Sequence, residues 1–368
     1  MRNSKAGHIT GSIARTLLAI VFIFSGFVKA IDPLGTTYKI EDYLTAFGSF
    51  FAVFIPLAEP MAWILIAFEF LLGISLFFNI KTQVTSWLSL FLVCFMTPLT
   101  LYIAIVNPVS DCGCFGDALI LSNWATFGKN IVLLALVVVL LLTKRYIPQT
   151  FTGKAECGIF FLFVGVLLAV MLYGRLRLPM IDFRPYKVGN NIPALMEIPE
   201  DAEPDVYETT FVYAKEGVEK EFTLQDYPKN DSTWVFVRQN TKLIRKGYEP
   251  PIHDFTIVNA DMEDVTDDIL YAEDTVTLVV MYDLSKTSRK QAVKVNTLYK
   301  QEQGAGHTFF VVTGSGTDQI EAFTQEMQAE YPFYTADGTM LKTIIRANPG
   351  VVVLYEGTIV DKYNMRSR

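Results

Sequence analysis

The chain has 368 residues, 51% of them hydrophobic, and its 38 acidic against 31 basic side chains give a formal net charge of −7. This negative balance, with no basic stretch interleaved with aromatic residues and no glycine-rich phosphate motif, argues against nucleic-acid and nucleotide binding. Nearly all long apolar runs precede Tyr173, whereas most charge follows it. That asymmetry is typical of a membrane domain followed by a soluble domain.

Five apolar runs in the first half come close to the length of about 20 residues that a membrane-crossing helix needs. No small-residue cleavage site follows the first run, so we expect it to be a retained anchor and not a signal peptide. The five runs span roughly residues 12–31, 57–78, 84–106, 124–143 and 157–174.

Basic residues in the loops predict the orientation. If all five runs cross the membrane, the basic residues that flank them fall on one side. The positive-inside bias makes that side the cytoplasm. We therefore expect a five-pass protein of a bacterial inner membrane, with a cytoplasmic N-terminus and a periplasmic C-terminal domain. The alternative, with the fifth run lying along the membrane, leaves that domain cytoplasmic. The basic residues are Arg2, Lys5, Arg15, Lys81, Lys144, Arg145 and Lys154.

Ionisable residues within the runs are costly in lipid unless they are paired or face a cavity. Glu69 lies mid-run, whereas Lys29, Glu59 and Lys129 lie near the outer ends. At the helical rise, Glu69 is about 15 Å deeper than Glu59, so depth favours a pairing of Glu59 with Lys29 or Lys129. A buried polar latch between helices and a functional role both stay open.

The sequence "DCGCFGDA", residues 111–118, joins the third and fourth runs and carries Cys112 and Cys114. Gly113 removes the Cβ obstacle to a tight turn, which lets two such close cysteines bring their sulfurs together. The small strained ring favours a labile, catalytic disulfide. The flanking Asp111 and Asp117 act against this, because carboxylates disfavour a thiolate and should raise a cysteine pKa.

Three interpretations of the pair remain. A catalytic redox pair is favoured over a non-catalytic disulfide or structural loop. A metal site is least favoured, because the chain has only three histidines and two cysteines alone do not supply four ligands. No metal is predicted. Cys94 and Cys157, the other two cysteines, are expected to be buried packing residues.

Several stretches resemble known membrane families. "ARTLLAIVFIFSGFVKAIDP" and "EFLLGISLF" resemble the first two spans of DoxX-like proteins, and "DCGCFGDAL" followed by "WATFGKNIVLL" resembles the MauE branch. The resemblance covers roughly residues 10–145. It implies a four-helix bundle with periplasmic thiol-disulfide chemistry and a quinone as electron partner. The fifth span and the large outer domain depart from the family pattern.

The soluble half divides at the proline-rich "EPPIHDF". Before it, "VYETTFVYAKEGVEKEFTL" predicts a hairpin, and "STWVFVRQNTKLIRKGY" predicts a strand and a short helix. Beyond it, strands and helices alternate and end in a hairpin turning at Glu356 and Gly357, which predicts an α/β sheet covered on both faces. The expected strands are 275–283, 307–313 and a short one near Tyr334, and the expected helices are 286–303, 317–330 and 339–346.

This last pattern resembles the thioredoxin fold. The resemblance implies that Pro349 is the cis proline that faces the redox cysteines, yet the matching segment after Tyr282 reads "DLSKTSRK" and contains none. The domain is then either a redox-inactive docking domain, presenting clients or a partner thioredoxin to the cysteine loop, or a domain used for assembly.

These observations together predict an α-helical membrane bundle, with a four-helix core plus a fifth transmembrane helix, followed by a mixed α/β thioredoxin-like domain. We expect a thiol-disulfide oxidoreductase or redox-maturation factor that passes electrons between envelope protein thiols and the quinone pool through Cys112 and Cys114. The alternative is a non-enzymatic membrane subunit or scaffold, so whether the chain is an enzyme stays open. Expected partners are lipid and a periplasmic thiol protein or thioredoxin-like protein, but not nucleic acid. The expected domains are residues 1–150, 151–178, 179–251 and 252–368.

Overall fold

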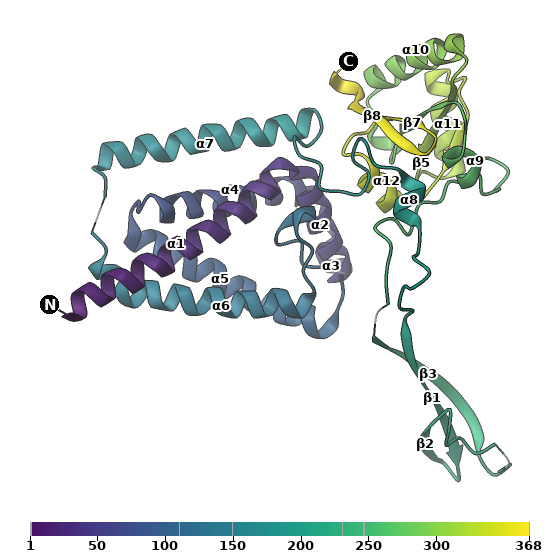
Figure 1. The fold of residues 1–368 in the computed structure, drawn as a ribbon. Helices are drawn as coiled ribbons and strands as arrows, with labels where there is room; N and C mark the ends of the chain where they lie inside the picture. Colours follow the sequence, from purple (N-terminus) through teal and green to yellow (C-terminus); the bar gives the residue numbers. More distant parts are fainter. Residues whose placement is uncertain (1, 110, 149, 230, 246, 368) are drawn as a thin grey trace. The chain divides into compact units, whose positions relative to one another are not determined.

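The computed structural model describes every residue except 1, 110, 149, 230, 246 and 368. The chain forms two compact units, one made of Met1–Gly189 and Thr256–Arg368 and the other of Asn190–Phe255. The first unit contains a helical bundle and a C-terminal α/β domain, residues 256–368, and both are drawn in Figure 1.

Five of the described helices are long and apolar enough to cross a membrane, which confirms the predicted class of membrane protein. Their outer faces carry large exposed hydrophobic side chains such as Phe91 and Leu142, which suit contact with lipid. The helices are α1 (Arg2–Ile31), α4 (Ala58–Phe77), α5 (Thr82–Val106), α6 (Asn123–Thr143) and α7 (Gly153–Leu176).

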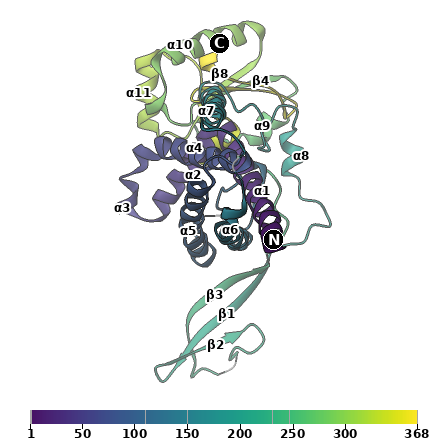
Figure 2. The same ribbon diagram turned by 90° about the vertical axis from the view of Figure 1, so that its left-hand side faces the viewer.

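Four of these helices share one core, and α7 packs against its outside, as Figure 2 shows in a view nearly along the helices. The shared core includes Phe22 of α1, Leu72 of α4 and Val137 of α6, together with residues of α5. A second cluster joins Leu167 and Met171 of α7 to α1 and α4. The arrangement is a four-helix core with a fifth helix added to one side.

Two glycines bring α1 and α4 into backbone contact. A Cβ on Gly26 would lie 2.7 Å from backbone atoms of Phe70, and one on Gly73 would lie 2.7 Å from the backbone nitrogen of Ile23. Small residues of this kind let membrane helices approach closely. The two contacts fix the register of α1 against α4.

The prediction that Cys94 and Cys157 are buried is wrong, because both side chains are exposed. Val93 of α5 faces the shared core, and at about 100° per residue the next position, Cys94, turns away from it. Helix α5 is continuous through Pro98, and the Thr97 hydroxyl donates a hydrogen bond of 2.7 Å to the carbonyl of Val93.

Short helices connect the spans. Asp32 caps α2 (Pro33–Ala46) by accepting a hydrogen bond of 2.9 Å from the Gly35 amide, and Pro33 suits the first helical position. Between α2 and α4 lie α3 (Ser49–Ala52) and the 3₁₀ turn η1 (Ile55–Leu57). The turns η2 (Gly116–Ala118) and η3 (Lys144–Tyr146) come before and after α6.

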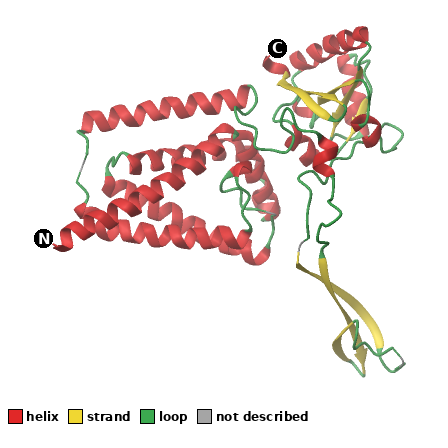
Figure 3. Cartoon of the chain, viewed as in Figure 1, coloured by secondary structure: helices red, strands yellow, loops and turns green. Residues whose placement is uncertain are grey.

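The second unit contains α8 (Ile192–Met196) and an antiparallel sheet of order β2-β1-β3. Strands β1 (Val206–Lys215) and β2 (Val218–Thr223) form the predicted hairpin. The predicted short helix is wrong, because residues 235–245 form one continuous strand, β3 (Val235–Arg245), which pairs with β1 over most of its length. Figure 3 draws the strands of this sheet in yellow.

The C-terminal domain has a five-stranded mixed sheet of order β6-β5-β4-β7-β8. Strands β4, β5 and β6 are parallel, and β7 and β8 are antiparallel to their neighbours. This confirms the mixed α/β class. The strands are β4 (Thr275–Val280), β5 (Thr308–Thr313), β6 (Phe333–Thr335), β7 (Gly350–Tyr355) and β8 (Thr358–Asn364).

Helices pack on this sheet, and its central strand β4 is buried along all but its first residue. Such burial explains the nearly continuous apolar sequence of β4. The peptide bond Asn348–Pro349, directly before β7, is cis, as expected for this proline. The helices and turns are α9 (Thr266–Leu270), η4 (Leu284–Lys286), α10 (Arg289–Ala305), α11 (Thr317–Met327), α12 (Gly338–Ile344) and η5 (Met365–Ser367).

Candidate redox site at the CGC loop

The two cysteines of the loop between α5 and α6 lie side by side as free thiols. Their Sγ atoms are 3.0 Å apart, and both side chains are partly buried. Gly113 between them has φ +64°, a conformation that glycine adopts without steric cost. A Cβ at this position would also lie 2.8 Å from Cγ of Lys39. The turn that brings the sulfurs together therefore requires glycine.

The bundle holds this loop at several points. The Tyr43 hydroxyl of α2 donates a hydrogen bond of 2.7 Å to the carbonyl of Cys112, and the Ser25 hydroxyl of α1 donates to the carbonyl of Cys114. Asp111 accepts a hydrogen bond of 2.8 Å from the Gly113 amide. The ammonium of Lys39 in α2 lies 2.9 Å from the Asp111 carboxylate. The loop is thus held at each residue from 111 to 114.

The environment distinguishes the two thiols. A hydrogen bond from the Cys112 thiol lowers the pKa of Cys114, and the positive charges of Lys129 and Lys29 act in the same direction against the effect of burial. The same hydrogen bond, together with burial, raises the pKa of Cys112. Cys114 is therefore the favoured thiolate and Cys112 the favoured thiol.

The expectation that the flanking carboxylates disfavour a thiolate is wrong for Cys114. Each carboxylate has a cation at hydrogen-bond distance, Lys39 for Asp111 and Arg346 for Asp117. These cations partly compensate the negative charges of the two carboxylates. The charges that matter most for Cys114 come from the bundle.

Lys29 meets Glu69 and not Glu59, so the predicted pairing is wrong. Nζ of Lys29 lies 2.6 Å from Oε2 of Glu69 and donates a hydrogen bond of 2.9 Å to the Ser25 hydroxyl. The reason is the helix register. Gly26 contacts Phe70, and a helical side chain points back toward its own N-terminus, so Lys29 reaches the residue beside Phe70.

The other two predicted charges find different partners. Glu59 pairs with Arg175 near the end of α7, a partner that the sequence reasoning missed although Arg175 follows the fifth apolar run directly. Lys129 does not pair with Glu59 either. Its Nζ lies 4.6 Å from the centre of the ring of Phe115, the residue that follows Cys114.

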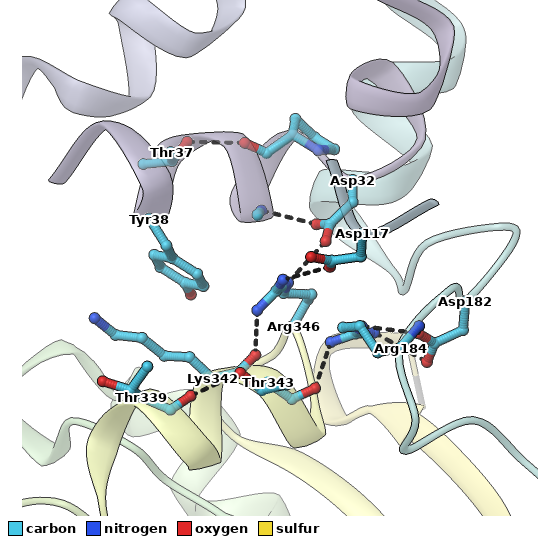
Figure 4. Close-up of polar contacts among 12 residues, drawn as sticks. Asp32, Thr37, Tyr38, Asp117, Asp182, Arg184, Thr339, Lys342, Thr343 and Arg346 are labelled. Atoms are coloured by element: carbon cyan, nitrogen blue, oxygen red, sulfur yellow. Dashed lines mark hydrogen bonds and ion pairs between the residues drawn. The ribbon is translucent and has the colours of Figure 1, made fainter. Parts of the chain in front are cut away.

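Asp117 contacts the C-terminal domain through Arg346, which also binds Asp32, as Figure 4 shows. The spacing of Lys39 and Tyr43, four positions apart on one helix face, was a usable signal for a contact surface. Nothing in the sequence connects Arg346 to the loop. The residues of the site that sequence reasoning missed are Ser25, Asp32, Lys39, Tyr43 and Arg346.

A cavity of about 340 Å³ opens beside the cysteines, a size in the range of small-molecule pockets. Its walls are mainly apolar and come from the end of α1, from α2, α4 and α5, from the cysteine loop and from the segment after α7. Polar groups and both thiols occupy part of the wall. The lining includes Leu65, Phe95, Met96 and Leu99, with Lys29, Lys39, Tyr43, Cys112 and Cys114. Among the described residues, no three His, Cys, Asp or Glu side chains are grouped so that they could hold a metal ion.

The cis proline belongs to a second region, where the C-terminal domain faces α2. Pro349 follows Asn348, whose side chain donates a hydrogen bond of 2.7 Å to the carbonyl of Asp283 after β4. The residue before Asp283 is Tyr282, whose hydroxyl accepts a hydrogen bond of 3.0 Å from the hydroxyl of Tyr38 in α2. The sequence has no cysteine in this part of the chain.

Comparison with known proteins finds a family model that matches the bundle. Residues 7–143, which include most of α1 and the whole of α2 to α6, match the membrane family "Methylamine utilisation protein MauE", which confirms the predicted resemblance to that family. Residues 207–246 match a family described as "Domain of unknown function (DUF8463)". No curated protein sequence matches the chain significantly.

One solved structure matches weakly. It is the solution structure of a candidate protein disulfide isomerase from Bacteroides thetaiotaomicron, 21% identical, covering 31% of this chain and 77% of that chain with a TM-score of 0.26. A score at this level does not establish a shared fold.

Proposed function

We propose that this chain is a thiol-disulfide oxidoreductase of the bacterial inner membrane, which passes electrons between envelope protein thiols and the quinone pool through Cys112 and Cys114. The observation that carries the proposal is the contact of 3.0 Å between two free thiols in the wall of a mainly apolar cavity. The match of residues 7–143 to the MauE family supports a membrane redox role.

The exchange with a client is balanced by two electrons and two protons. A client thiolate attacks the Cys112–Cys114 disulfide, forms a mixed disulfide with one sulfur and releases the other as a thiolate. A second client thiolate then breaks the mixed disulfide, so that the client becomes the disulfide and the CGC pair becomes two thiols. The relative reduction potentials set the direction of the exchange.

A quinone would supply the complementary two-electron, two-proton chemistry in the cavity. The residues fit such a ligand, because apolar side chains such as Phe95 and Leu99 suit a flat ring while Lys29 and Tyr43 offer donors. Lys29 contributes a buried positive charge near Cys114, which stabilises the thiolate form. A serine hydroxyl of α1 links that ammonium to the carbonyl of Cys114.

An apolar segment suits access from lipid. Residues 47–57, between α2 and α4, include Phe50 and Val53, each 74% exposed, as expected for a segment in the membrane interface. Phe47, the first residue of this segment, and Met61, in α4 directly after it, both line the cavity. A lipid-soluble electron partner would enter here.

The proposed topology has a cytoplasmic N-terminus, five crossings and a periplasmic CGC loop and C-terminal domain. It is supported by the packing of α7 along α1 and α4, which favours a fifth crossing. The contact of Arg346 with Asp117 is consistent with a loop and a C-terminal domain on the same side of the membrane. Oxidising conditions on the periplasmic side suit thiol-disulfide chemistry.

The C-terminal domain is proposed to be a redox-inactive, thioredoxin-like domain that docks partners. A second candidate function for the whole chain, a non-enzymatic scaffold, is favoured by one observation: Cys157 is the last cysteine in the sequence, so the C-terminal domain has no thiol of its own. A domain without thiols can bind partners but cannot exchange disulfides with them. The two candidate functions therefore differ in what the CGC loop does, and not in what this domain does.

The test is client trapping in full-length protein. Cys112→Ser and Cys114→Ser should each abolish turnover of a disulfide client, and one of them should accumulate a mixed disulfide with that client. Cys94→Ser and Cys157→Ser are the matched controls, because both side chains are exposed and outside the loop, and they should leave turnover unchanged. Full turnover in both loop variants would leave the scaffold as the remaining candidate.

A further inference from the structure

Arg346 is the point at which the C-terminal domain reaches the cysteine loop. It follows α12, and its side chain is only 8% exposed. Its Nε lies 2.8 Å from Oδ2 of Asp32, and its Nη2 lies 3.1 Å from Oδ2 of Asp117. Nη1 donates to the carbonyl of Lys342 in its own domain. One guanidinium thus joins two carboxylates of the bundle to α12 (Figure 4).

One of the two carboxylates lies in the cysteine loop, and the other lies at the start of the helix that binds this loop. Asp117 stands three residues after Cys114, in η2. Asp32 caps α2, the helix whose lysine and tyrosine bind the loop at Asp111 and Cys112. A change at Arg346 therefore acts on the loop directly and through α2.

Electrostatic attraction stabilises Arg346 between Asp32 and Asp117. Burial raises the pKa of Asp117. Burial alone would also raise the pKa of Asp32, but the nearby guanidiniums, Arg346 foremost, lower it below its usual value. Without Arg346, the carboxylates of Asp32 and Asp117, which are 18% and 43% exposed, would lose their shared cation, and the loss would be greater for the less exposed Asp32. Other contacts of the same surface are Tyr38 with Tyr282 and Lys342 with Glu41.

We propose that Arg346 is a positioning residue for the CGC pair, which couples docking of the C-terminal domain to the closure of the Cys112–Cys114 disulfide. The proposal rests on the proposed redox function. Holding Asp117 and α2 in place keeps the two sulfurs close, so docking favours the disulfide. Because such coupling is reciprocal, the disulfide in turn favours docking.

The experiment measures the disulfide equilibrium without client or quinone. Full-length protein carrying Cys94→Ser and Cys157→Ser is equilibrated with oxidised and reduced dithiothreitol, which take up and supply the two electrons and two protons. Remaining thiols are then counted by alkylation and mass spectrometry. Arg346→Ala should lower the equilibrium constant for disulfide formation about fivefold or more, and Arg346→Lys should restore part of it.

Arg289→Ala is the matched control. Arg289 belongs to the same domain but is 80% exposed and pairs with Glu326, so its loss should leave the equilibrium unchanged. Asp117→Asn weakens the same contact from the bundle side with little change of shape. It should shift the equilibrium in the same direction, and combining it with Arg346→Ala should add little, since neighbouring groups in one contact are not additive.

An equilibrium constant within twofold of the parent in both Arg346→Ala and Asp117→Asn would overturn the proposal. So would an equal shift in Arg289→Ala. Because neither client nor quinone takes part, this failure is separate from failure of the proposed function, which is judged by turnover and trapping.

Discussion

The ion pair of Lys29 and Glu69 shows how one residue can serve both stability and chemistry. Both side chains are nearly buried, at 7% and 12% exposure. Lys29 also donates to Ser25, which holds the carbonyl of Cys114. A buried pair that loses one partner leaves an uncompensated charge in low dielectric.

Lys29→Met should therefore destabilise the bundle by about 3 kcal/mol, the lower end of the cost for breaking a buried pair. The double variant Lys29→Met with Glu69→Met removes both charges and should recover most of that loss. Thermal unfolding in detergent measures both. If the single variant melts with the parent, the pair contributes little to stability.

The lowered pKa of Cys114 predicts a specific pH dependence. A thiol with an ordinary pKa of about 8.5 loses its thiolate below that pH. Because the Cys112 thiol and two lysines lower the pKa of Cys114, its thiolate should persist to lower pH, and in the reduced protein it should react with iodoacetamide there. Cys112, whose pKa is raised, should not react with iodoacetamide at that lower pH.

Peptide mass spectrometry across a pH series separates the two sites. Cys112→Ala removes the hydrogen bond to Cys114 and should move the half-reaction of Cys114 to higher pH. Faster labelling of Cys112 than of Cys114 at neutral pH would contradict the assignment of the thiolate.

At the residue scale, sequence identified the chemistry better than the partners. Lys29, Glu69 and the cysteines were singled out because charges in lipid and close thiols are rare. The predicted partner of Lys29 is wrong because the depth estimate assumes that the two helices start at the same level of the membrane. The contact at Gly26 sets a different register. Arg346 lies 229 residues from Asp117, a separation at which sequence patterns carry no contact information.

At the scale of elements, the close approach of α1 and α4 decides where these side chains meet. Gly26→Val should push the helices apart, because a Cβ there would lie 2.7 Å from the backbone of Phe70. Overpacking of this kind typically costs about 1–3 kcal/mol. Gly165→Val in α7 is the control, since nothing lies within 4 Å of a Cβ at that position.

Thermal unfolding again provides the measurement, with a lower melting temperature for Gly26→Val only. Equal melting of both variants would show that the register does not depend on this glycine. The α1–α4 contact would then have to be explained by the larger side chains around it.

The long elements were predictable and the short ones were not. Five apolar runs of the right length led to five helices, since lipid demands internally bonded backbone. Helix α2, which carries Lys39 and Tyr43 to the loop, was not predicted as an element. The sequence predicts a short helix within what is strand β3, whose pairing with β1 extends it over 11 residues.

At the scale of the whole molecule, the bundle carries the thiols and the C-terminal domain carries none. The α/β class followed from alternating strand and helix patterns, because each period reports local geometry. The docking of that domain on α2 and η2 did not follow, since it depends on side chains such as Tyr282 and Arg346 that lie far in sequence from their partners.

The most direct test of the central claim is quinone-dependent oxidation of the CGC pair. Full-length protein with Cys94→Ser and Cys157→Ser retains Cys112 and Cys114 as its only thiols. It is reduced, freed of reductant without oxygen and mixed in lipid nanodiscs with a fully ring-substituted short-chain benzoquinone, which cannot alkylate thiols. We predict that both thiols become unreactive toward alkylation as one quinol forms per chain, and that Cys114→Ser blocks this oxidation. Two thiols that stay reduced with no quinol formed would contradict it.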